Sequence, residues 1–263
     1  MKIAVIGGGN MGGAVAAGAI RAGVVAAQDV VVSHLEPKCE PLFEGFRDQI
    51  TIEDDNAKAV EGANLVVVAV KPWMMEQIMG EIAPALDRSR QAVVSIAAGV
   101  TFDQLEVIAS NDKFGALGLY RIIPNTAIAI AQSVNFISKR GTSAEHDEAV
   151  LTIFSALGRC FEVEESMMTP MTSLSSCGIA FAYKYIDASI EGGVEVGIDR
   201  NVARDVVLQT VRGALMMLEG NGTMPQEEID KVTTKGGITL KGLEAMARNG
   251  FSEAVISGVK ESK

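Results

Sequence analysis

Residues 3–23 read IAVIGGGNMGGAVAAGAIRAG. A short β-branched run turns at consecutive glycines and continues as an Ala-rich segment that Gly23 ends. Gly7, Gly9 and Gly12 form the pattern G-x-G-x-x-G between a predicted strand and a predicted helix. The first glycine of this pattern permits a tight turn, the second admits a pyrophosphate, and the third lets the helix pack closely on the strand. The stretch predicts a dinucleotide-binding turn, and a purely structural glycine turn is the alternative.

Apolar runs recur after this stretch and predict a series of strands with helices between them. After the first strand at residues 2–6, further strands are expected at 30–33, 65–70, 92–96, 118–123 and 134–138. Helical segments are expected at 36–46, 54–62, 73–86, 101–111 and 143–158. Uninterrupted apolar runs are typical of strands that are covered on both faces. The β-α-β-α order therefore predicts an α/β fold with a doubly wound parallel sheet of the Rossmann type.

The second half changes character, because no strand is expected after Glu164. Asp199 is a predicted N-cap and Pro225 fits the first turn of a short helix. Helices are expected at 173–196, 199–219, from 225, at 238–248 and at 252–262. We expect residues 1–162 to form an NAD(P)-binding Rossmann domain and residues 163–263 an all-α dimerisation domain that also binds substrate. The long helix carries an apolar stripe that a domain of this size would bury in a partner subunit.

The composition excludes several classes of protein. Of 263 residues, 33 are acidic and 23 are basic, which gives a net charge of −10 and argues against a nucleic-acid binder. Three cysteines and two histidines fit neither a disulfide framework nor a zinc site, so we expect no metal. No apolar run approaches the ~18 residues of a membrane span, and glycines interrupt the first run too early for an export signal. We expect a cytoplasmic protein that does not contact membranes.

The residues after the second strand bear on the choice of cofactor. NAD-binding folds commonly have an acidic residue there, about 20 positions after the glycines. This sequence has Ser33 and His34, which can donate hydrogen bonds to a 2′-phosphate, and Lys38 follows. Glu36 would repel a phosphate if it pointed inward. NADP(H) is therefore favoured and NAD(H) is the alternative.

Ligands in such sheets bind beyond the carboxyl ends of the strands. Val70, Lys71 and Pro72 follow the third predicted strand, Ala97 and Gly99 follow the fourth, and residues 124–126 follow the fifth. We expect these residues to line the same edge of the sheet as the glycine turn.

Two loops of the helical half have small or hydroxyl residues beside glycine just before a helix. They are residues 173–178 and residues 233–239. Free N–H groups at a helix start suit a carboxylate, and plain capping is the alternative. This half has no histidine, and Lys184 is either a base or a surface residue. Reduction of an imine asks less of the protein than reduction of a carbonyl, because the nitrogen can arrive protonated, so the site leans slightly toward C=N chemistry.

The motifs resemble those of the pyrroline-5-carboxylate reductase family over nearly the whole chain. The matching segments are I-G-x-G-N-M-G at 6–12, Asn56 before the third strand, A-V-K-P at 69–72, R-x-x-P-N-T at 121–126, and the loops at 172–180 and 234–239. The resemblance implies hydride transfer from NAD(P)H to the C=N carbon of 1-pyrroline-5-carboxylate, which gives L-proline in the last step of proline biosynthesis. It also implies a homodimer of interleaved helices, with further assembly into decamers.

The resemblance assigns roles to matching residues. Cofactor contacts fall on Gly9, Asn10, Met11, Ser33, His34, Asn56, Lys71 and Ala97, in addition to Gly7, Gly12, Lys38, Val70, Pro72 and Gly99 from the patterns above. The substrate carboxylate pocket falls on Ser176, Cys177, Gly178, Gly237, Ile238 and Thr239, with Ser175 beside them in the same loop. Thr239 matches a threonine that bonds the ring nitrogen and is the expected catalytic residue. Glu191 matches a glutamate of the long helix.

The two substrate loops depart from the family pattern. Ser176 and Cys177 replace Gly-Ser, Ile179 replaces Pro, Lys235 replaces Pro, and Ile238 replaces Thr; Ala127 also replaces the Pro after Asn-Thr. Two alternatives therefore stay open: a reductase of another cyclic imine or small carboxylate, and a cofactor-binding regulator with a degraded site. A 3-hydroxyacid dehydrogenase is disfavoured, because residues 184–187 lack the Asn of Lys-x-x-Asn.

Overall fold

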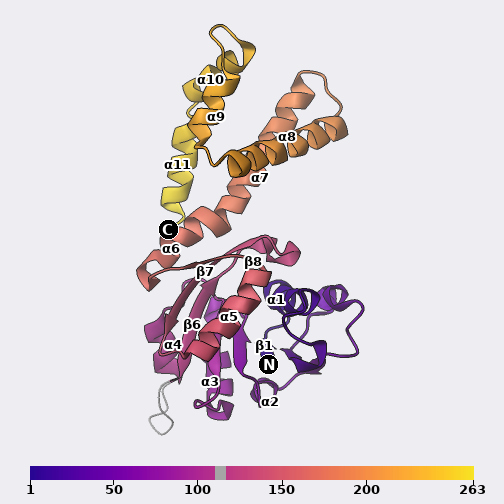
Figure 1. Ribbon diagram of the computed structural model, residues 1–263, viewed down its shortest axis with the longest axis vertical. Helices are drawn as coiled ribbons and strands as arrows, with labels where there is room; N and C mark the ends of the chain where they lie inside the picture. Colours follow the sequence, from indigo (N-terminus) through magenta and orange to yellow (C-terminus); the bar gives the residue numbers. More distant parts are fainter. Residues whose placement is uncertain (110–116) are drawn as a thin grey trace. The chain divides into compact units, whose positions relative to one another are not determined.

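The computed structural model describes residues 1–109 and 117–263 (Figure 1). Its first part is an eight-stranded sheet with strands in the order β3-β2-β1-β4-β5-β6-β7-β8. The strands are β1 (Ile3–Ile6), β2 (Val30–Ser33), β3 (Thr51–Glu53), β4 (Leu65–Val68), β5 (Ala92–Ser95), β6 (Gly118–Ile123), β7 (Ser133–Arg140) and β8 (Gly158–Glu162). The pairs from β3 to β6 are parallel, β7 is antiparallel to β6, and β8 is parallel to β7. The doubly wound sheet is confirmed.

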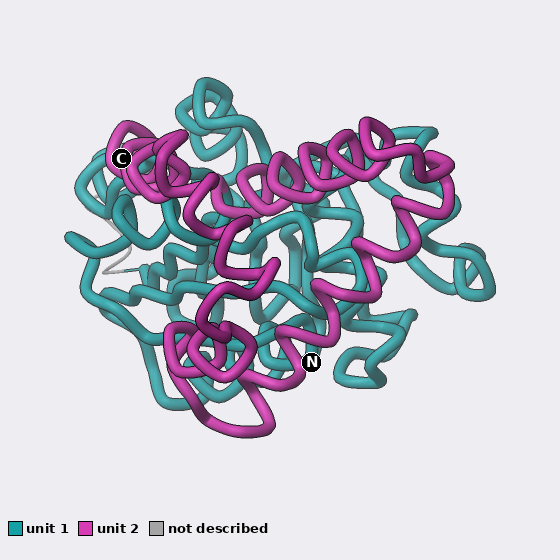
Figure 2. Tube along the Cα trace, turned by 90° about the horizontal axis from the view of Figure 1, so that it is seen from above, with its two compact units in different colours: residues 1–176 teal, residues 177–263 magenta. Residues whose placement is uncertain are grey.

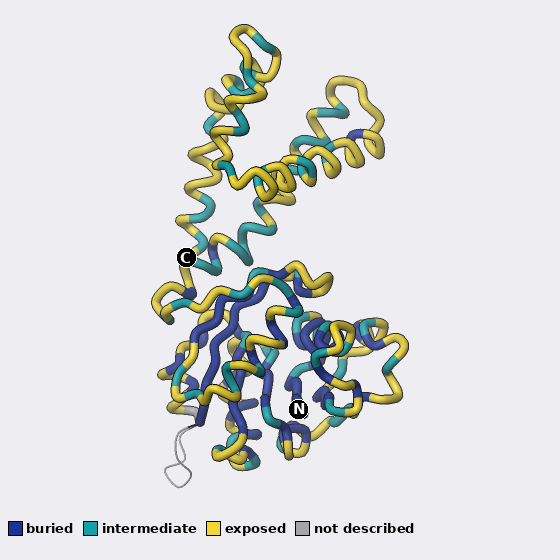
Figure 3. The backbone as a smooth tube through the Cα atoms, viewed as in Figure 1, coloured by how far each residue is buried: buried dark blue, intermediate teal, exposed yellow. Residues whose placement is uncertain are grey.

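Successive residues of the central strands enter two different apolar clusters. In β1, Ile3 and Val5 belong to one cluster, whereas Ala4 and Ile6 belong to the other. Helices α1 (Asn10–Arg21) and α5 (Ala144–Ala156) cover the first face, and α2 (Asn56–Ala59), α3 (Met75–Ile82) and α4 (Phe102–Ala109) cover the second (Figure 1). Covering on both faces explains why these strands are uninterrupted apolar runs. Figure 3 shows the sheet as the buried part of this unit.

Several predicted elements differ from those observed. The edge strands β3 and β8 were not predicted, because their partly exposed residues give no apolar run. The segment expected as a helix at 36–46 is a 3₁₀ helix, η2 (Pro37–Phe43), with a proline inside it. The helix expected at 54–62 is the short α2, and the one at 73–86 is α3 between two 3₁₀ turns. Residues 110–111 of the predicted helix at 101–111 lie outside the described residues.

The second part of the chain is helical. Its elements are α6 (Met168–Thr172), a π-helical turn (Ser173–Cys177), α7 (Gly178–Glu195), α8 (Arg200–Asn221), α9 (Pro225–Val232), α10 (Ile238–Arg248) and α11 (Phe251–Glu261). Asp199 caps α8 by accepting hydrogen bonds from the backbone N–H groups of Asn201 and Val202, as predicted. Gly222 ends α8 in the left-handed conformation.

The chain groups into two compact units, residues 1–176 and 177–263 (Figure 2). The predicted division after residue 162 assigns α6 to the helical domain. In the structure, Met168 of α6 packs with Ile123 and Phe136 of the sheet.

The helical unit buries almost nothing by itself. Among residues 177–263, all of which are described, Ala203 alone is buried (Figure 3). Large apolar side chains such as Tyr183, Val206 and Met216 are more than half exposed. A helical unit without a core of its own needs a partner to cover these side chains.

Candidate functional site

A cleft of about 830 Å³ lies at the carboxyl edge of the sheet. It brings together eleven of the fourteen residues predicted to bind cofactor: Gly7, Gly9, Asn10, Met11, His34, Lys38, Asn56, Val70, Lys71, Pro72 and Ala97. The other three lie elsewhere: Gly12 behind the glycine turn, Ser33 buried beneath the cleft, and Gly99 on a neighbouring cleft with Trp73 and Asp103. The cleft coincides with the edge where β1, β4 and β5 end, which is the usual ligand edge of such a sheet.

The glycine turn is built so that side chains would not fit. Gly7 has φ +98°, and a Cβ on it would lie 3.0 Å from the carbonyl oxygen of Ala69. A Cβ on Gly12 would lie only 2.1 Å from the carbonyl oxygen of Gly7, so this glycine allows α1 to pack on β1. Gly9 is the N-cap of α1, and no side chain among the described residues caps this helix. Its first N–H groups therefore face the cleft as an anion site, which fits the diphosphate of a dinucleotide.

A chain of hydrogen bonds runs behind one end of the cleft. The Ser33 hydroxyl, fully buried, donates to Oδ1 of Asn56. Nδ2 of Asn56 donates to Oε2 of Glu81 across 2.7 Å, and Nε2 of Gln77 donates to Oε1 of the same carboxylate across 2.9 Å. These two donors lower the pKa of Glu81, so the carboxylate stays charged. Asn56 is thus fixed with its amide group oriented between a hydroxyl and a carboxylate.

A second acidic residue lines the same end. Oε2 of Glu36 lies 2.8 Å from Nζ of Lys38, and this hydrogen bond raises the pKa of Lys38. His34 beside them has a positive φ of 50°, a conformation that residues other than glycine seldom adopt.

Sequence reasoning missed Glu81 and Gln77 as cleft residues. Both lie on the polar face of α3, four residues apart, and such a pair is visible in the sequence. Which polar positions of the helix face the cleft depends on how α3 is rotated against the sheet. The buried side chains Met75, Ile78 and Ile82 determine that rotation.

The first predicted substrate loop is a π-helical turn tied to the loop after β6. Nδ2 of Asn125 donates to Oγ of Ser175 across 3.1 Å, and Oγ of Ser176 donates to the carbonyl of Pro124 across 3.2 Å. π-helical turns occur often at functional sites. Cys177 is the last residue of this turn, and Gly178 is the first residue of α7. The chain is helical without a break from α6 through the turn into α7, so the expectation of free N–H groups at a helix start is wrong for this loop.

The second predicted loop precedes α10. Gly236 has φ +77°, and a Cβ on Gly237 would lie 2.8 Å from the Thr234 hydroxyl, so both positions require glycine. Ile238 and Thr239 are the first residues of α10 and are exposed, Ile238 by 87%. No side chain among the described residues caps this helix, which leaves its first N–H groups free.

Glu191 and Lys184 on α7 have surface partners. Glu191 forms a bidentate ion pair with Arg200 of α8, and this pair lowers the pKa of the Glu191 carboxyl group. Lys184 is 80% exposed and lies 3.2 Å from Asp187. This environment favours the surface interpretation of Lys184 over that of a base.

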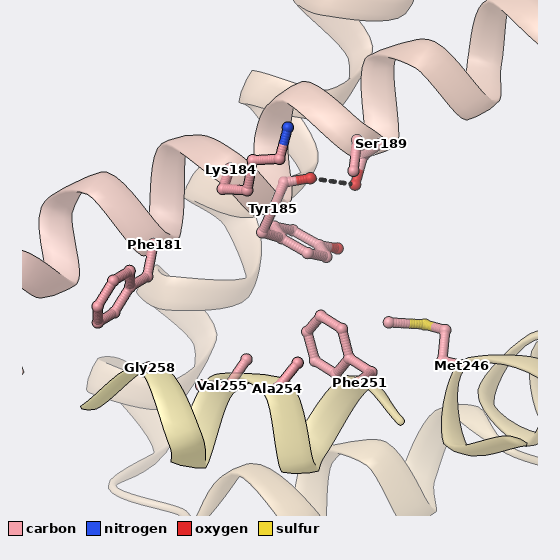
Figure 4. A pocket seen from close by; sticks show the side chains of 10 residues that line it. Phe181, Lys184, Tyr185, Ser189, Met246, Phe251, Ala254, Val255 and Gly258 are labelled. Carbon is pink, nitrogen blue, oxygen red and sulfur yellow. Dashed lines mark hydrogen bonds between the residues drawn. The ribbon is translucent and has the colours of Figure 1, made fainter. Parts of the chain in front are cut away.

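A mostly apolar pocket of about 520 Å³ separates α7 from α10 and α11 (Figure 4). Phe181 and Tyr185 of α7 face Phe251 and Val255 of α11, and Met246 of α10 closes one end. The Tyr185 and Phe251 rings meet edge to face with centroids 6.2 Å apart. Apolar surface of this kind is typical of a protein interface.

Comparisons with known proteins agree with this organisation. Residues 165–263 match the family model described as pyrroline-5-carboxylate reductase dimerisation. Residues 2–99 match the one described as NADP oxidoreductase, coenzyme F420-dependent. The pyrroline-5-carboxylate reductase of Methanosarcina acetivorans is 33% identical over 100% of this chain and 97% of its own. The chain belongs to the pyrroline-5-carboxylate reductase family.

Other relatives of the family agree along the whole chain. The pea pyrroline-5-carboxylate reductase is 31% identical over 99% of this chain and 94% of its own. The crystal structure of Plasmodium falciparum pyrroline carboxylate reductase with NADP bound superposes with a TM-score of 0.88, at 24% identity, over 100% of this chain and 95% of that chain. The family's dimerisation region begins at residue 165, three residues after the predicted end of the Rossmann domain.

Two further properties concern the described residues only. No helix within them combines the length and the apolar character that a membrane crossing requires. Three or more His, Cys, Asp or Glu side chains do not come together anywhere in this part of the chain in a way that could hold a metal ion.

Proposed function

We propose that this chain reduces 1-pyrroline-5-carboxylate to L-proline with NADP(H) as the favoured cofactor and NAD(H) as the alternative. The observation that carries the proposal is the cleft at the carboxyl edge of the sheet, lined by the glycine turn and by Lys71 and Ala97. Full-length similarity to curated reductases of this family supports the same reaction.

Different residues of the cleft contact different parts of the dinucleotide. When bound, the reduced nicotinamide supplies a hydride to the C=N carbon. The N–H groups at the start of α1 bind the diphosphate, and Gly9 lets it approach the backbone. Asn56, His34 and Lys38 contact the adenosine end. Lys71 and Ala97 contact the cofactor beyond the ends of β4 and β5.

The helical loops hold the substrate. The free backbone N–H groups at the start of α10, at Ile238 and Thr239, bind its carboxylate, in the way that free helix N-termini bind anions. Ser176, Cys177 and Gly178 line the pocket with their side chains and backbone. The Thr239 hydroxyl bonds the ring nitrogen and fixes the face that receives the hydride. Because the imine nitrogen arrives protonated, the chain needs no histidine as a proton donor. Lys235 adds a cation to the second loop and could shift the preference toward another cyclic imine acid.

The helical unit forms a homodimer, and the exposed apolar side chains on α7, α8 and α11 are the surface that the second copy covers. Decamers would be built from these dimers. Light scattering should give a mass of at least two chains, and Val206→Asp should lower it. Leu151→Asp, on the exposed face of α5 in the sheet unit, serves as the matched control and should leave the mass unchanged. A monodisperse monomer would contradict the dimer.

Oxidation of NADPH at 340 nm with pyrroline-5-carboxylate tests the activity. We expect turnover that Thr239→Ala lowers at least tenfold, whereas Thr210→Ala, an exposed threonine on α8, leaves it unchanged. Binding of NADPH without turnover of this imine would instead support a reductase of another cyclic imine. Binding without turnover of any cyclic imine would support a regulator.

A further inference from the structure

The segment after β2 crosses directly over the glycine turn. The N–H of Gly8 donates to the carbonyl of Ser33 across 2.8 Å, and the N–H of Glu36 donates to the carbonyl of Gly8 across 3.1 Å. A Cβ on Gly8 would lie 2.6 Å from Cα of Leu35, so the two backbones are in contact. This reciprocal pairing fixes where the side chain of Glu36 begins.

The carboxylate of Glu36 lies over Gly9. A Cβ built on Gly9 would be 2.7 Å from Oε1 of Glu36. Gly9 is the glycine whose missing side chain admits the cofactor to the backbone. Glu36 therefore lies inside the cleft and not on the outer surface of the loop.

Lys38 is restrained by the same carboxylate. The two side chains form an ion pair of 2.8 Å, and both are about half exposed or more. Exposed ion pairs are weak, so Lys38 can exchange Glu36 for a phosphate. The exchange would leave the Glu36 carboxylate unpaired beside that phosphate, and like charges at such distances repel.

Ser33, another of the expected phosphate donors, is already engaged. The Ser33 hydroxyl uses its only proton in the bond to Oδ1 of Asn56, whose orientation is fixed by the bond to Glu81. In this arrangement Ser33 offers lone pairs and no donor to a 2′-phosphate. Recognition of that phosphate therefore falls on Lys38 and His34, which both line the cleft.

We propose that Glu36 is a specificity-determining residue that weakens binding of the 2′-phosphate by holding Lys38 and by placing a negative charge beside Gly9. This inference rests on the proposed use of a nicotinamide dinucleotide. Glu36 makes NADH a competitive cofactor and limits the preference for NADPH. Its carboxylate can also accept a hydrogen bond from the free 2′-hydroxyl of NADH, as acidic residues do in NAD-binding folds.

Calorimetric titration of NADP⁺ and NAD⁺ tests this without turnover, because the two differ only in the 2′-phosphate. Glu36→Gln should tighten NADP⁺ binding about five- to tenfold and leave NAD⁺ binding unchanged or weaker. Adding Lys38→Ala should abolish the gain, since the two residues act on the same phosphate. Glu40→Gln removes an exposed charge from the same η2 segment and is the matched control.

Three results separate the possibilities. An unchanged ratio of the two dissociation constants in Glu36→Gln, or an equal gain in Glu40→Gln, would overturn the proposed role of Glu36 and leave the proposed function standing. A changed ratio in a protein that reduces no pyrroline-5-carboxylate would overturn the proposed substrate and support the role of Glu36. A wild-type protein that binds neither dinucleotide would overturn both proposals.

Discussion

The side-chain amide of Asn125 and the hydroxyl of Ser175 meet at 3.1 Å, although fifty positions separate them in the sequence. Asn125 also accepts a hydrogen bond from the N–H of Ala127, and its own N–H donates to the Ser133 hydroxyl. The residue is buried, so these bonds are shielded from water. The loop after β6 and the π-helical turn are therefore held as one structure.

Asn125→Ala should raise the KM for the imine several-fold while leaving the dissociation constant of NADPH within twofold. The substitution removes the support of the π-helical turn, which precedes the proposed carboxylate pocket. Ser175→Ala breaks only the hydrogen bond from Asn125, leaves the one from Ser176 to the Pro124 carbonyl, and should give a similar rise in KM with less loss of stability. Steady-state kinetics and nucleotide titration measure the two effects. An equal loss of imine and nucleotide binding would indicate general unfolding instead.

A network of ion pairs around Arg121 of β6 should affect stability more than the Asn125–Ser175 hydrogen bond does. Arg121 is buried, and its NH1 group lies 2.7 Å from Oε1 of Glu165. The same oxygen accepts from the N–H of Phe102 across 2.7 Å, at the start of α4. Arg140 pairs with the second oxygen of Glu165 across 3.3 Å.

Glu165→Ala should therefore lower the free energy of unfolding by about 3 kcal/mol, because it leaves the buried Arg121 without its counterion. Glu106→Ala removes a more exposed partner of Arg140 and should cost at most about 0.5 kcal/mol. Urea denaturation followed by circular dichroism measures both. Equal losses in the two variants would show that the burial of Arg121 does not determine the cost.

Much of the fold follows from local sequence. Strands β1, β4 and β5 are predicted because every residue in them is buried. Each therefore appears in the sequence as a short apolar run, which indicates a strand covered on both faces. The cap at Asp199 is predicted because it depends on one residue's own chemistry.

The parts of the fold and of the site that the sequence does not predict depend on tertiary contacts. The strand β3 forms by pairing with β2 at the edge of the sheet, and its sequence TIE carries no apolar period. Likewise, the glycine turn predicts the cleft from sequence alone, whereas the position of Glu81 depends on the rotation of α3. The burial of Ser33 beneath Asn56 also depends on packing, since a serine at the end of a strand reads equally well as a ligand contact.

Two glycine substitutions should have opposite effects. Gly12→Ala places a Cβ 2.1 Å from the carbonyl oxygen of Gly7, so we expect a loss of about 2–3 kcal/mol in the free energy of unfolding and loss of nucleotide binding. Gly80→Ala lies within α3, where no heavy atom would come within 4 Å of the new Cβ. It should stabilise the protein by about 0.5–1 kcal/mol through reduced backbone entropy. Thermal unfolding with and without NADPH measures both, and a stable Gly12→Ala protein that binds NADPH would contradict the packing role.

The charge of Glu228 should contribute to stability in acid. Glu228 of α9 accepts hydrogen bonds from Lys231 across 2.6 Å and from Thr223 across 2.6 Å, and these donors lower its pKa to about 2. A depressed pKa in the folded state stabilises the protein above the ordinary pKa of a glutamate, about 4.3, and this contribution is lost as the pH falls toward 2. The difference in unfolding free energy between wild type and Glu228→Gln should therefore be constant from pH 7 to pH 5 and shrink from pH 5 to pH 2. Urea denaturation at one fixed protein concentration measures it, with Glu219→Gln on α8 as the control. A difference that stays the same down to pH 2.5 would mean that the charge of Glu228 does not contribute.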